Sequence, residues 1–367
     1  MRICHITTVH KQGDSRIFHK ECVSVARAGH EVYLVVANGQ SEVVNGVKII
    51  GVPFQVGSRV KRILGAGKEA MKEAAKLNAD IYHLHDPELL RIARKLKKKT
   101  GAKVVYDSHE DLQKQVLDKH WIPGPLRRIV SKLVHRYEMR VTSKLDGVIS
   151  VTKIICNKFR SANSNVALVA NYPILGELEA SMSVNKKLNS ICYVGGLFPT
   201  RGIKELVQSL EFCNAELLLA GNFSTPEFES ELKQLDGWKK VHYYGFVNRE
   251  KIAEIIHSSE VGMVTLHPTR SYKEALPIKL FEYMSVGIPV IASDFELWKP
   301  YVLDVGCGLM ADPQDPKSIA SKIDYLLSNK EEASEMGERG RKVAYEKYSW
   351  SSQAETLLNF YSSLIDS

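Results

Sequence analysis

The sequence predicts an α/β protein built from two doubly wound, Rossmann-like domains in tandem. Short apolar, β-branched runs alternate with helix-length segments along the whole chain. These runs are almost continuously hydrophobic, as in parallel strands that are covered on both faces. The alternation lapses once near the middle and then restarts. The chain has 367 residues, which at roughly 100–200 residues per domain is long enough for two domains.

The first half contains seven of these predicted strands: Ile3–Val9, Glu31–Val36, Val47–Val52, Ile81–Leu84, Val104–Tyr106, Val148–Val151 and Val166–Val169. The segments between them carry apolar residues at helical spacing. In the segment that starts at Leu126, for example, they recur as far as Tyr137. We expect the sheet to bury this apolar face.

No period holds between Tyr172 and Asn189, where Pro, Gly, Ser and charged residues are mixed. We interpret residues 173–189 as a linker between a first domain, residues 1–172, and a second domain, residues 190–349. The second domain contains the predicted strands Ile191–Val194, Leu217–Ala220, Val241–Tyr244, Val261–Leu266 and Pro289–Ala292.

Composition indicates an ordinary globular protein, since 44% of the residues are hydrophobic and 25% are charged. The 6 cysteines form no C-x-x-C pair and are interpreted as buried thiols in a reducing compartment. No apolar run approaches the roughly 20 residues of a membrane span. We therefore expect a cytoplasmic protein, with a place at the inner face of the membrane left open.

Charge divides unevenly between the two halves. Residues 1–180 contain 30 Lys and Arg against 17 Asp and Glu, whereas residues 181–367 contain 20 against 25. A basic first half indicates an anionic partner such as a phosphorylated substrate, a membrane surface or nucleic acid.

The segment 271–294 is the most informative part of the sequence. Pro277 suits the first turn of a helix, and the free backbone N–H groups from Leu276 to Lys279 would form an anion site there. Glu274 precedes this helix and Glu282 lies inside it. Two carboxylates beside an anion site are explained if each accepts hydrogen bonds from the hydroxyls of a nucleotide-sugar. Two surface glutamates beside a helix start are the simpler interpretation, and residue chemistry leaves both open.

The Glu-x7-Glu pattern, followed by the residues GIPVIASD, resembles the signature of the retaining glycosyltransferases of family four. Further segments are similar to landmarks of this family in the family's order: HITTVHKQGDSRIFHKECVSVARAGHEVYLV, HLHDPELL, YDSHED, LVANYPI, YVGGLFPTRGIKEL, LLLAGN and YYGFV. The resemblance implies a GT-B fold, with the two domains facing across a cleft. It also implies that a C-terminal helix, residues 350–367, crosses back onto the first domain.

The resemblance implies site roles position by position. Glu274 would contact the transferred sugar, and His109 would touch the same sugar. Glu282 would hold the ribose hydroxyls. The other matched positions are expected near the diphosphate, the sugar or the end of the first domain: Gly13, Asp14, Asn171, Gly196, Leu276, Pro277 and Ile278.

One departure from the family concerns the cations that bind the diphosphate. Most members have a Gly-Arg pair and then a Lys-Gly pair, whereas this chain has Gly195-Gly196 and then Arg201-Gly202. Arg201 can replace the lysine because guanidinium binds phosphate well. Lys279, Lys204 or Arg16 is expected to supply the missing cation.

On the acceptor side, His10 and Arg16 follow the first strand and are expected to contact substrate. His85 and Asp86 are expected to line the cleft, and we favour this over metal binding by His83, His85 and Asp86. No D-x-D motif occurs, so neither a metal nor another cofactor is expected. The segment Leu112–Pro125, with Trp121, is a candidate acceptor loop, and an ordinary connecting loop is the alternative.

The sequence thus predicts a metal-independent transferase that moves a hexosyl or N-acetylhexosaminyl group from a nucleotide-sugar to a glycan or lipid-linked acceptor. UDP-sugars are favoured over GDP-sugars, and a role in cell-surface polysaccharide synthesis is expected. The basic half is interpreted as attraction to an anionic acceptor, with peripheral contact to an anionic membrane. The alternatives are a nucleotide-sugar epimerase of the same fold and a non-catalytic nucleic-acid-binding module. The second lacks any recognition motif, so we expect no nucleic-acid partner.

Overall fold

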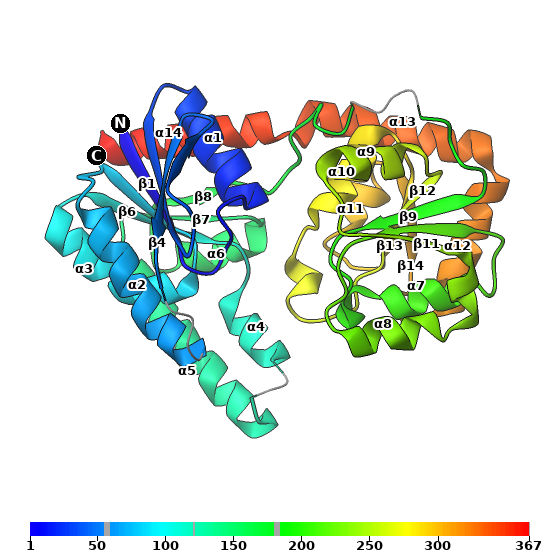
Figure 1. Cartoon of the computed structure of the whole chain (residues 1–367), viewed down its shortest axis with the longest axis horizontal. Helices are drawn as coiled ribbons and strands as arrows, with labels where there is room; N and C mark the ends of the chain where they lie inside the picture. Colours follow the sequence, from blue (N-terminus) through cyan, green and yellow to red (C-terminus); the bar gives the residue numbers. More distant parts are fainter. Residues whose placement is uncertain (55–58, 120–121, 180–183, 367) are drawn as a thin grey trace. The chain divides into compact units, whose positions relative to one another are not determined.

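The computed structural model describes residues 1–54, 59–119, 122–179 and 184–366, with the backbone alone described for residues 59–64. The chain divides into two compact units (Figure 1). The first unit is Met1–Asn171 together with Trp350–Ser367, and the second is Tyr172–Ser349.

The first unit contains an eight-stranded sheet in the order β3-β4-β2-β1-β5-β6-β7-β8. Its strands are β1 (Arg2–Thr7), β2 (Glu31–Ala37), β3 (Glu42–Val44), β4 (Val47–Val52), β5 (Ile81–Leu84), β6 (Lys103–Ser108), β7 (Gly147–Ser150) and β8 (Val166–Leu168). All neighbours pair in parallel except β3 and β4. The strand order reverses between β1 and β5, which is where ligands bind in sheets of this kind.

Helices lie on both faces of this sheet (Figure 1). They are the π-helical segment η1 (Ser15–Cys22), α1 (Val23–Arg27), α2 (Arg59–Ala75), the short η2 (Pro87–Leu89), α3 (Leu90–Thr100), α4 (Leu112–Asp118), α5 (Gly124–Thr142), α6 (Lys153–Arg160) and α14 (Trp350–Ile365). Helix α14 joins the first unit although it ends the chain. Trp350 Nε1 donates to Ser24 Oγ at 2.8 Å, and Gln353 Oε1 accepts from the Ala170 amide at 2.8 Å.

The second unit contains a six-stranded parallel sheet in the order β11-β10-β9-β12-β13-β14. Its strands are β9 (Ser190–Val194), β10 (Glu216–Ala220), β11 (Val241–Gly245), β12 (Val261–Val264), β13 (Val290–Ser293) and β14 (Gly308–Ala311). Here the order reverses between β9 and β12. The prediction of an α/β protein with two Rossmann-like domains is confirmed.

The helices of the second unit also cover both faces of its sheet (Figure 1). They are η4 (Pro199–Arg201), α7 (Ile203–Ser209), α8 (Pro226–Lys233), η5 (Asp236–Lys240), α9 (Arg249–His257), η6 (Tyr272–Glu274), α10 (Ile278–Val286), α11 (Lys299–Val302), α12 (Pro316–Ser328) and α13 (Lys330–Lys347).

The hydrophobic cores explain why the strands are apolar throughout. In β9, Ile191 and Tyr193 belong to one buried cluster, whereas Cys192 and Val194 belong to a second one. Successive side chains of a strand point to opposite faces, so both faces of β9 are covered. All six cysteines are buried, and none forms a disulfide.

Three sequence expectations differ from the structure. Strands β3 and β14 were not predicted, because a three- or four-residue edge strand carries too little periodicity to detect. Most of the segment expected as an acceptor loop, Leu112–Pro125, is helical, since α4 occupies Leu112–Asp118 and α5 begins at Gly124. The apolar face of α5 is not buried by the sheet: Leu133 is 57% exposed.

Candidate functional site

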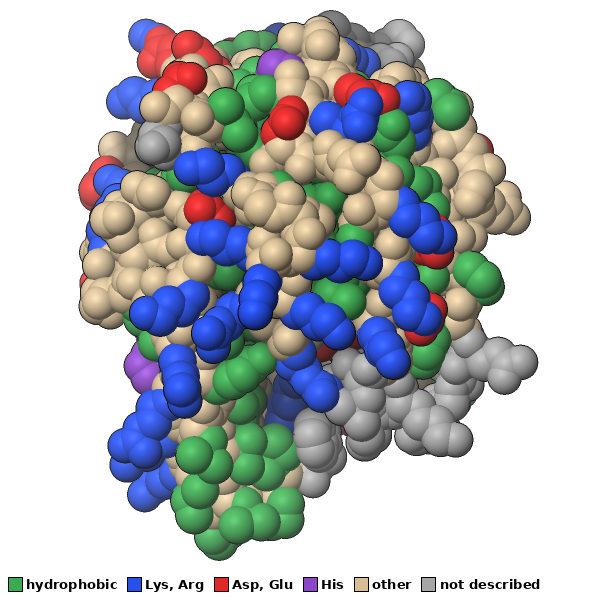
Figure 2. All heavy atoms as spheres, turned by 90° about the vertical axis from the view of Figure 1, so that its left-hand side faces the viewer, with side chains coloured by type: hydrophobic (Ala, Val, Ile, Leu, Met, Phe, Trp, Pro, Cys, Tyr) green, Lys and Arg blue, Asp and Glu red, His purple; other side chains and the backbone are tan. Residues whose placement is uncertain are grey.

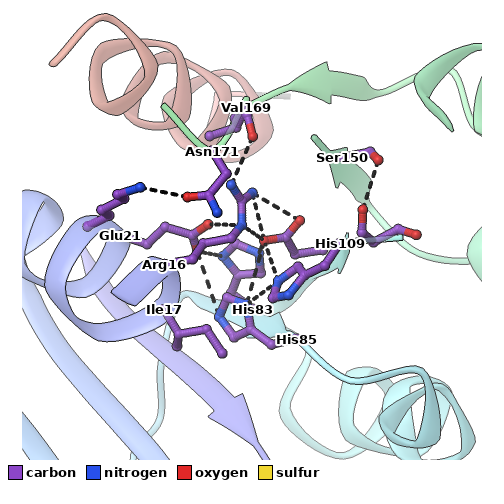
Figure 3. A network of polar contacts seen from close by, with 12 residues as sticks. Arg16, Ile17, Glu21, His83, His85, His109, Ser150, Val169 and Asn171 are labelled. Atoms are coloured by element: carbon purple, nitrogen blue, oxygen red, sulfur yellow. Dashed lines mark hydrogen bonds and ion pairs between the residues drawn. The ribbon is translucent and has the colours of Figure 1, made fainter. Parts of the chain in front are cut away.

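Arg16 lies at the centre of a buried polar network at the carboxyl ends of β1, β5 and β6 (Figure 3). Its Nε and Nη2 donate to Asp107 Oδ2 at 3.0 and 2.9 Å, and its Nη1 donates to the Val169 carbonyl at 3.0 Å. Arg16 Nε also lies 3.0 Å from Glu21 Oε1. The Arg16 side chain is 5% exposed. The expectation that Arg16 contacts substrate or supplies the diphosphate cation is therefore wrong, because its guanidinium is already held by two buried carboxylates.

Three buried histidines extend this network toward the C-terminal helix. His5 Nδ1 lies 2.9 Å from His85 Nε2, and the Tyr361 hydroxyl of α14 lies 2.6 Å from His83 Nδ1. Burial lowers the pKa of His85 to about 4 and lowers those of His5 and His83 well below the ordinary value. The three imidazoles are thus neutral in the folded protein near neutral pH.

Glu21 lies among these histidines, with Oε2 at 3.8 Å from one nitrogen of each of His5, His83 and His85. The donor atoms of these four buried residues lie within 4.8 Å of one another, so the group could hold a metal ion. Arg16 compensates only one of the two carboxylates beside it. Burial raises the pKa of Glu21 well above its usual range, and a proton on Glu21 would neutralise the second charge without a metal.

Two side chains of this region reach the surface, His10 and His109. The Asp86 carboxylate is fixed by Thr7 Oγ1 at 2.9 Å and lies 2.9 Å from His10 Nδ1. His109 Nε2 lies 3.1 Å from Asp107 Oδ2, and its side chain is 21% exposed. The His10 and His109 rings lie 5.3 Å apart. Asp86 thus holds the His10 imidazole, and Asp107 holds that of His109.

Other predicted residues of the first unit have structural roles. Asp14 caps η1, because its Oδ1 accepts from the amides of Arg16 and Ile17, each at 2.9 Å. Asp14, in the loop that the resemblance implies near the diphosphate, is thus engaged with the start of η1, and Gly13 is exposed beside it. Asn171 Oδ1 accepts from Lys20 Nζ at 2.7 Å. Trp121 lies outside the described residues.

We expect acidification to destabilise the first unit, because its buried histidines have lowered pKa values. As the pH falls below 6.5, histidines of the unfolded chain bind protons that the folded ones do not, so stability falls with pH. For His85, whose pKa in the folded protein is about 4, the free energy of unfolding should fall by about 3 kcal/mol as the pH falls from 6.5 to that value. The raised pKa of Glu21 has the opposite effect on stability, but only this one group opposes the three histidines.

Thermal unfolding at pH 7.5 and at pH 5 measures this effect. His242→Gln, at an exposed position, should keep the wild-type pH dependence, whereas His85→Gln should weaken it. A melting temperature that stays constant between the two pH values would contradict the expectation.

In the second unit, the segment from Glu274 to Glu282 lies beyond β12. Glu274 ends η6, and α10 begins at Ile278, directly after Pro277. Trp298 Nε1 donates to the Ala275 carbonyl at 2.7 Å and fixes the turn between them. The amide groups of the first turn of α10 are oriented toward its start, as an anion site requires.

Two cations converge beside the end of β9. A Cβ atom at Gly195 would lie 3.2 Å from Lys279 Nζ and 3.4 Å from Arg201 Nη1. Lys279 is 6% exposed, and neither its Nζ nor Arg201 Nε has a hydrogen-bond partner. Lys279 Nζ lies 3.6 Å from the ring centroid of Tyr193. Burial first, and then the charge of Arg201, lower the pKa of Lys279 well below its usual value.

The neighbouring Gly196 leaves little room for the arginine that most family members have after the corresponding strand. A Cβ atom at Gly196 would lie 2.7 Å from Cε2 of Phe198, so a longer side chain there would displace that ring. Lys204 pairs instead with Glu231 and is exposed. Of the three residues expected to replace the cation, only Lys279 lies beside Arg201.

Glu282 is 4% exposed and accepts from Arg249 Nη1 at 2.9 Å. Arg249 Nη2 donates in turn to Glu177 Oε2 at 2.6 Å. The side chain of Glu282 is therefore held in place by the Arg249 guanidinium, which Glu177 positions in turn.

Residues 13–171 match the family described as Glycosyltransferase Family 4, and residues 177–343 match the family described as Glycosyl transferases group 1. The chain belongs to glycosyltransferase family 4. The uncharacterized glycosyltransferase MJ1607 of Methanocaldococcus jannaschii is 26% identical over 365 residues, which cover 92% of this chain and 90% of that protein.

Solved structures show the same GT-B fold as this glycosyltransferase. HepE of Anabaena, solved in complex with UDP-glucose, is 14% identical with a TM-score of 0.74, and the match covers 99% of this chain and 100% of HepE. WaaG, a glycosyltransferase involved in lipopolysaccharide biosynthesis, is 17% identical with a TM-score of 0.73, covering 97% of this chain and 98% of WaaG.

Several residues of the candidate sites were not identified from the sequence of this glycosyltransferase. Tyr193 and Arg249 contact Lys279 and Glu282 in the second unit, and Tyr361 contacts His83 in the first, only because of the tertiary structure. Glu21 and Asp107 occur within family landmarks, but only burial beside Arg16 shows what they do. A charged residue within an otherwise apolar helix face, such as Glu21 between Ile17 and Val25, was the available signal.

Proposed function

We propose that this glycosyltransferase binds the diphosphate of a nucleotide-sugar between Lys279, Arg201 and the first turn of α10. The observation that supports it is the buried Lys279 beside the half-buried Arg201, a pair that forms no salt bridge among the described residues. Two like charges in a buried place repel each other. A bound diphosphate would remove the free-energy cost of this repulsion. The two cations would also stabilise the diphosphate as it departs from the sugar.

We further propose that the donor is a UDP-sugar, in line with the ligand of HepE, and that a hexosyl or N-acetylhexosaminyl group is transferred with retention. Glu282 would accept from the ribose hydroxyls, and Glu274 would contact the sugar. The acceptor would be a glycan or a lipid-linked glycan in cell-surface polysaccharide synthesis, a process in which WaaG takes part for lipopolysaccharide. The enzyme would act in the cytoplasm at the inner face of the membrane.

The central experiment measures the melting temperature with UDP, GDP and ADP. A ligand that binds only the folded state raises it by mass action, and UDP should raise it most. Incubation with UDP-sugars and a lipid-linked acceptor should give a glycosylated product with the donor's anomeric configuration. Absence of stabilisation by all three nucleotides would overturn the proposal, and conversion of the donor without acceptor would indicate an epimerase.

We propose that no metal takes part, since Lys279 and Arg201 provide the positive charge at the donor site. Transfer should persist in the presence of a chelator. Stoichiometric metal in the purified protein, with loss of transfer after chelation, would contradict this; the candidate ligands would then be the group of His5, Glu21, His83 and His85 and the group of His85, Asp107 and His109.

Lys279→Met should have opposite effects on binding and on stability. Loss of one charge-assisted contact should weaken UDP binding by roughly 10–100-fold. The free protein should become more stable, because a buried and unpaired ammonium is replaced by an apolar group of similar length. Calorimetric titration with UDP and thermal unfolding measure the two effects.

Lys204→Met is the matched control for this variant, since Lys204 pairs with Glu231 at the surface. Its UDP affinity should stay within about twofold of wild type, because exposed pairs contribute little. Equal losses of affinity in both variants would indicate a general charge effect rather than a contact by Lys279.

A further inference from the structure

Helix α5 exposes several large apolar side chains to solvent, although most of its buried residues are polar. Its buried residues are Ser131, Glu138, Val141 and Thr142. Its outward side carries four large apolar residues that are 42–57% exposed: Leu126, Ile129, Leu133 and Tyr137. An ordinary surface helix buries its large apolar residues, whereas α5 exposes these four, so they are suited to an apolar environment outside the first unit.

These four residues form a continuous stripe along the helix. Their spacing of three and four residues places them on one face. The stripe extends over about 16 Å at 1.5 Å per residue. Large apolar patches on a soluble protein mark interaction sites, whereas single exposed residues do not.

A row of cations borders the apolar stripe. Arg128, Lys132, Arg136 and Arg140 follow one another at intervals of four residues on α5. The acidic residue of the helix, Glu138, is buried and pairs with Lys158 Nζ at 2.6 Å. Figure 2 shows hydrophobic side chains gathered at the tip of the projection that α5 forms in Figure 1, with Lys and Arg side chains beside and above them.

Helix α3, which packs on α5, extends the basic surface. Five of its residues are exposed cations: Arg91, Arg94, Lys95, Lys98 and Lys99. The charge surplus of the first half of the sequence is therefore concentrated around one apolar stripe rather than spread evenly.

The chemistry of this surface selects among three partners. A second copy of the chain would bring two basic rows together, which repel each other. Nucleic acid would leave the leucine and isoleucine side chains against polar groups. A bilayer of anionic phospholipid satisfies both features, since apolar side chains enter the acyl boundary while the cations contact the headgroups.

We propose that helix α5 docks the first unit on an anionic phospholipid surface, with Leu126, Ile129, Leu133 and Tyr137 inserted and the row from Arg128 to Arg140 on the headgroups. This deepens the proposed function and rests on it, because docking would bring the enzyme to a lipid-linked acceptor. No described helix is both long enough and apolar enough to cross a membrane, and α5 would lie in the plane of the interface.

The test is co-sedimentation of the full-length protein with two kinds of vesicle. It should bind vesicles of phosphatidylcholine mixed with phosphatidylglycerol, bind less at high salt, and not bind phosphatidylcholine alone. Ile129→Ser with Leu133→Ser should weaken binding by roughly 10-fold or more. Replacing Arg128, Lys132 and Arg136 by Gln should weaken it about 100-fold.

The matched control replaces three exposed lysines of the second unit, Lys317, Lys342 and Lys347, by Gln, and should keep most of the binding. Equal loss in this control would show attraction by net charge alone and would overturn the proposal. So would a dimer in sedimentation velocity that Ile129→Ser with Leu133→Ser abolishes. Stabilisation by UDP should be unchanged in every α5 variant, so failure of docking is distinguishable from failure of the proposed function.

Discussion

Glu274→Gln should reduce glycosyl transfer by about 10²–10³-fold while leaving the affinity for UDP within about threefold of wild type. Glu274 ends η6, before the turn that precedes α10, whereas the cations proposed to hold the diphosphate come from α10 and η4. If the Glu274 carboxylate contacts the transferred sugar, its negative charge would stabilise the positive charge that develops on that sugar during transfer. Initial rates with a UDP-sugar and calorimetry with UDP separate the two effects.

Glu335→Gln provides the control for this change of charge, because its side chain is 72% exposed on α13. Transfer by this variant should match wild type. Should Glu274→Gln lose UDP affinity in proportion to its rate, Glu274 would be a nucleotide contact instead. Should it lose neither, Glu274 would be a surface carboxylate, which was the simpler interpretation of the sequence.

Arg16→Met should destabilise the first unit by about 3–5 kcal/mol, because it leaves the buried Asp107 carboxylate without its cation. A residue with a substrate role, as the sequence suggested for Arg16, would lower activity with little change in stability. Urea unfolding monitored by circular dichroism measures the free energy of unfolding. The lost stability should be partly restored when Asp107→Asn is added, since the unpaired charge is then removed as well.

Arg27→Met is the matched control for Arg16→Met, since Arg27 is an exposed arginine at the end of the neighbouring helix α1. Its free energy of unfolding should change by less than about 0.5 kcal/mol. A loss below about 1 kcal/mol in Arg16→Met would show that the carboxylates take up protons at little cost and that the network is not a structural element.

The sequence predicted well what depends on local pattern. The continuous apolar runs predicted parallel strands, and the helix start at Pro277 was placed one residue from its position in the structure. Edge strands β3 and β14 and helix α4 were not predicted, because such short elements are stabilised mainly by their neighbours.

The sequence predicted less well what depends on which side chains meet. It offered Lys279, Lys204 and Arg16 as equal replacements for one cation. Lys279 lies beside Arg201, Lys204 pairs with Glu231, and Arg16 is buried with Asp107. Sequence position cannot separate these three outcomes, because each depends on contacts with residues distant in the sequence.

The sequence by itself determined the fold class and the family, since hydrophobic period and ordered motifs are written locally along the chain. Tertiary structure alone decided which charges are neutralised and which apolar faces remain uncovered. Arg16 and Lys279 are both buried cations, but one is compensated and the other faces a second cation. The helical period of Leu126, Ile129 and Leu133 is that of a core helix, yet only the packing of α5 shows this face turned to solvent. Burial and pairing are properties of the whole assembly of elements, and a linear pattern does not contain them.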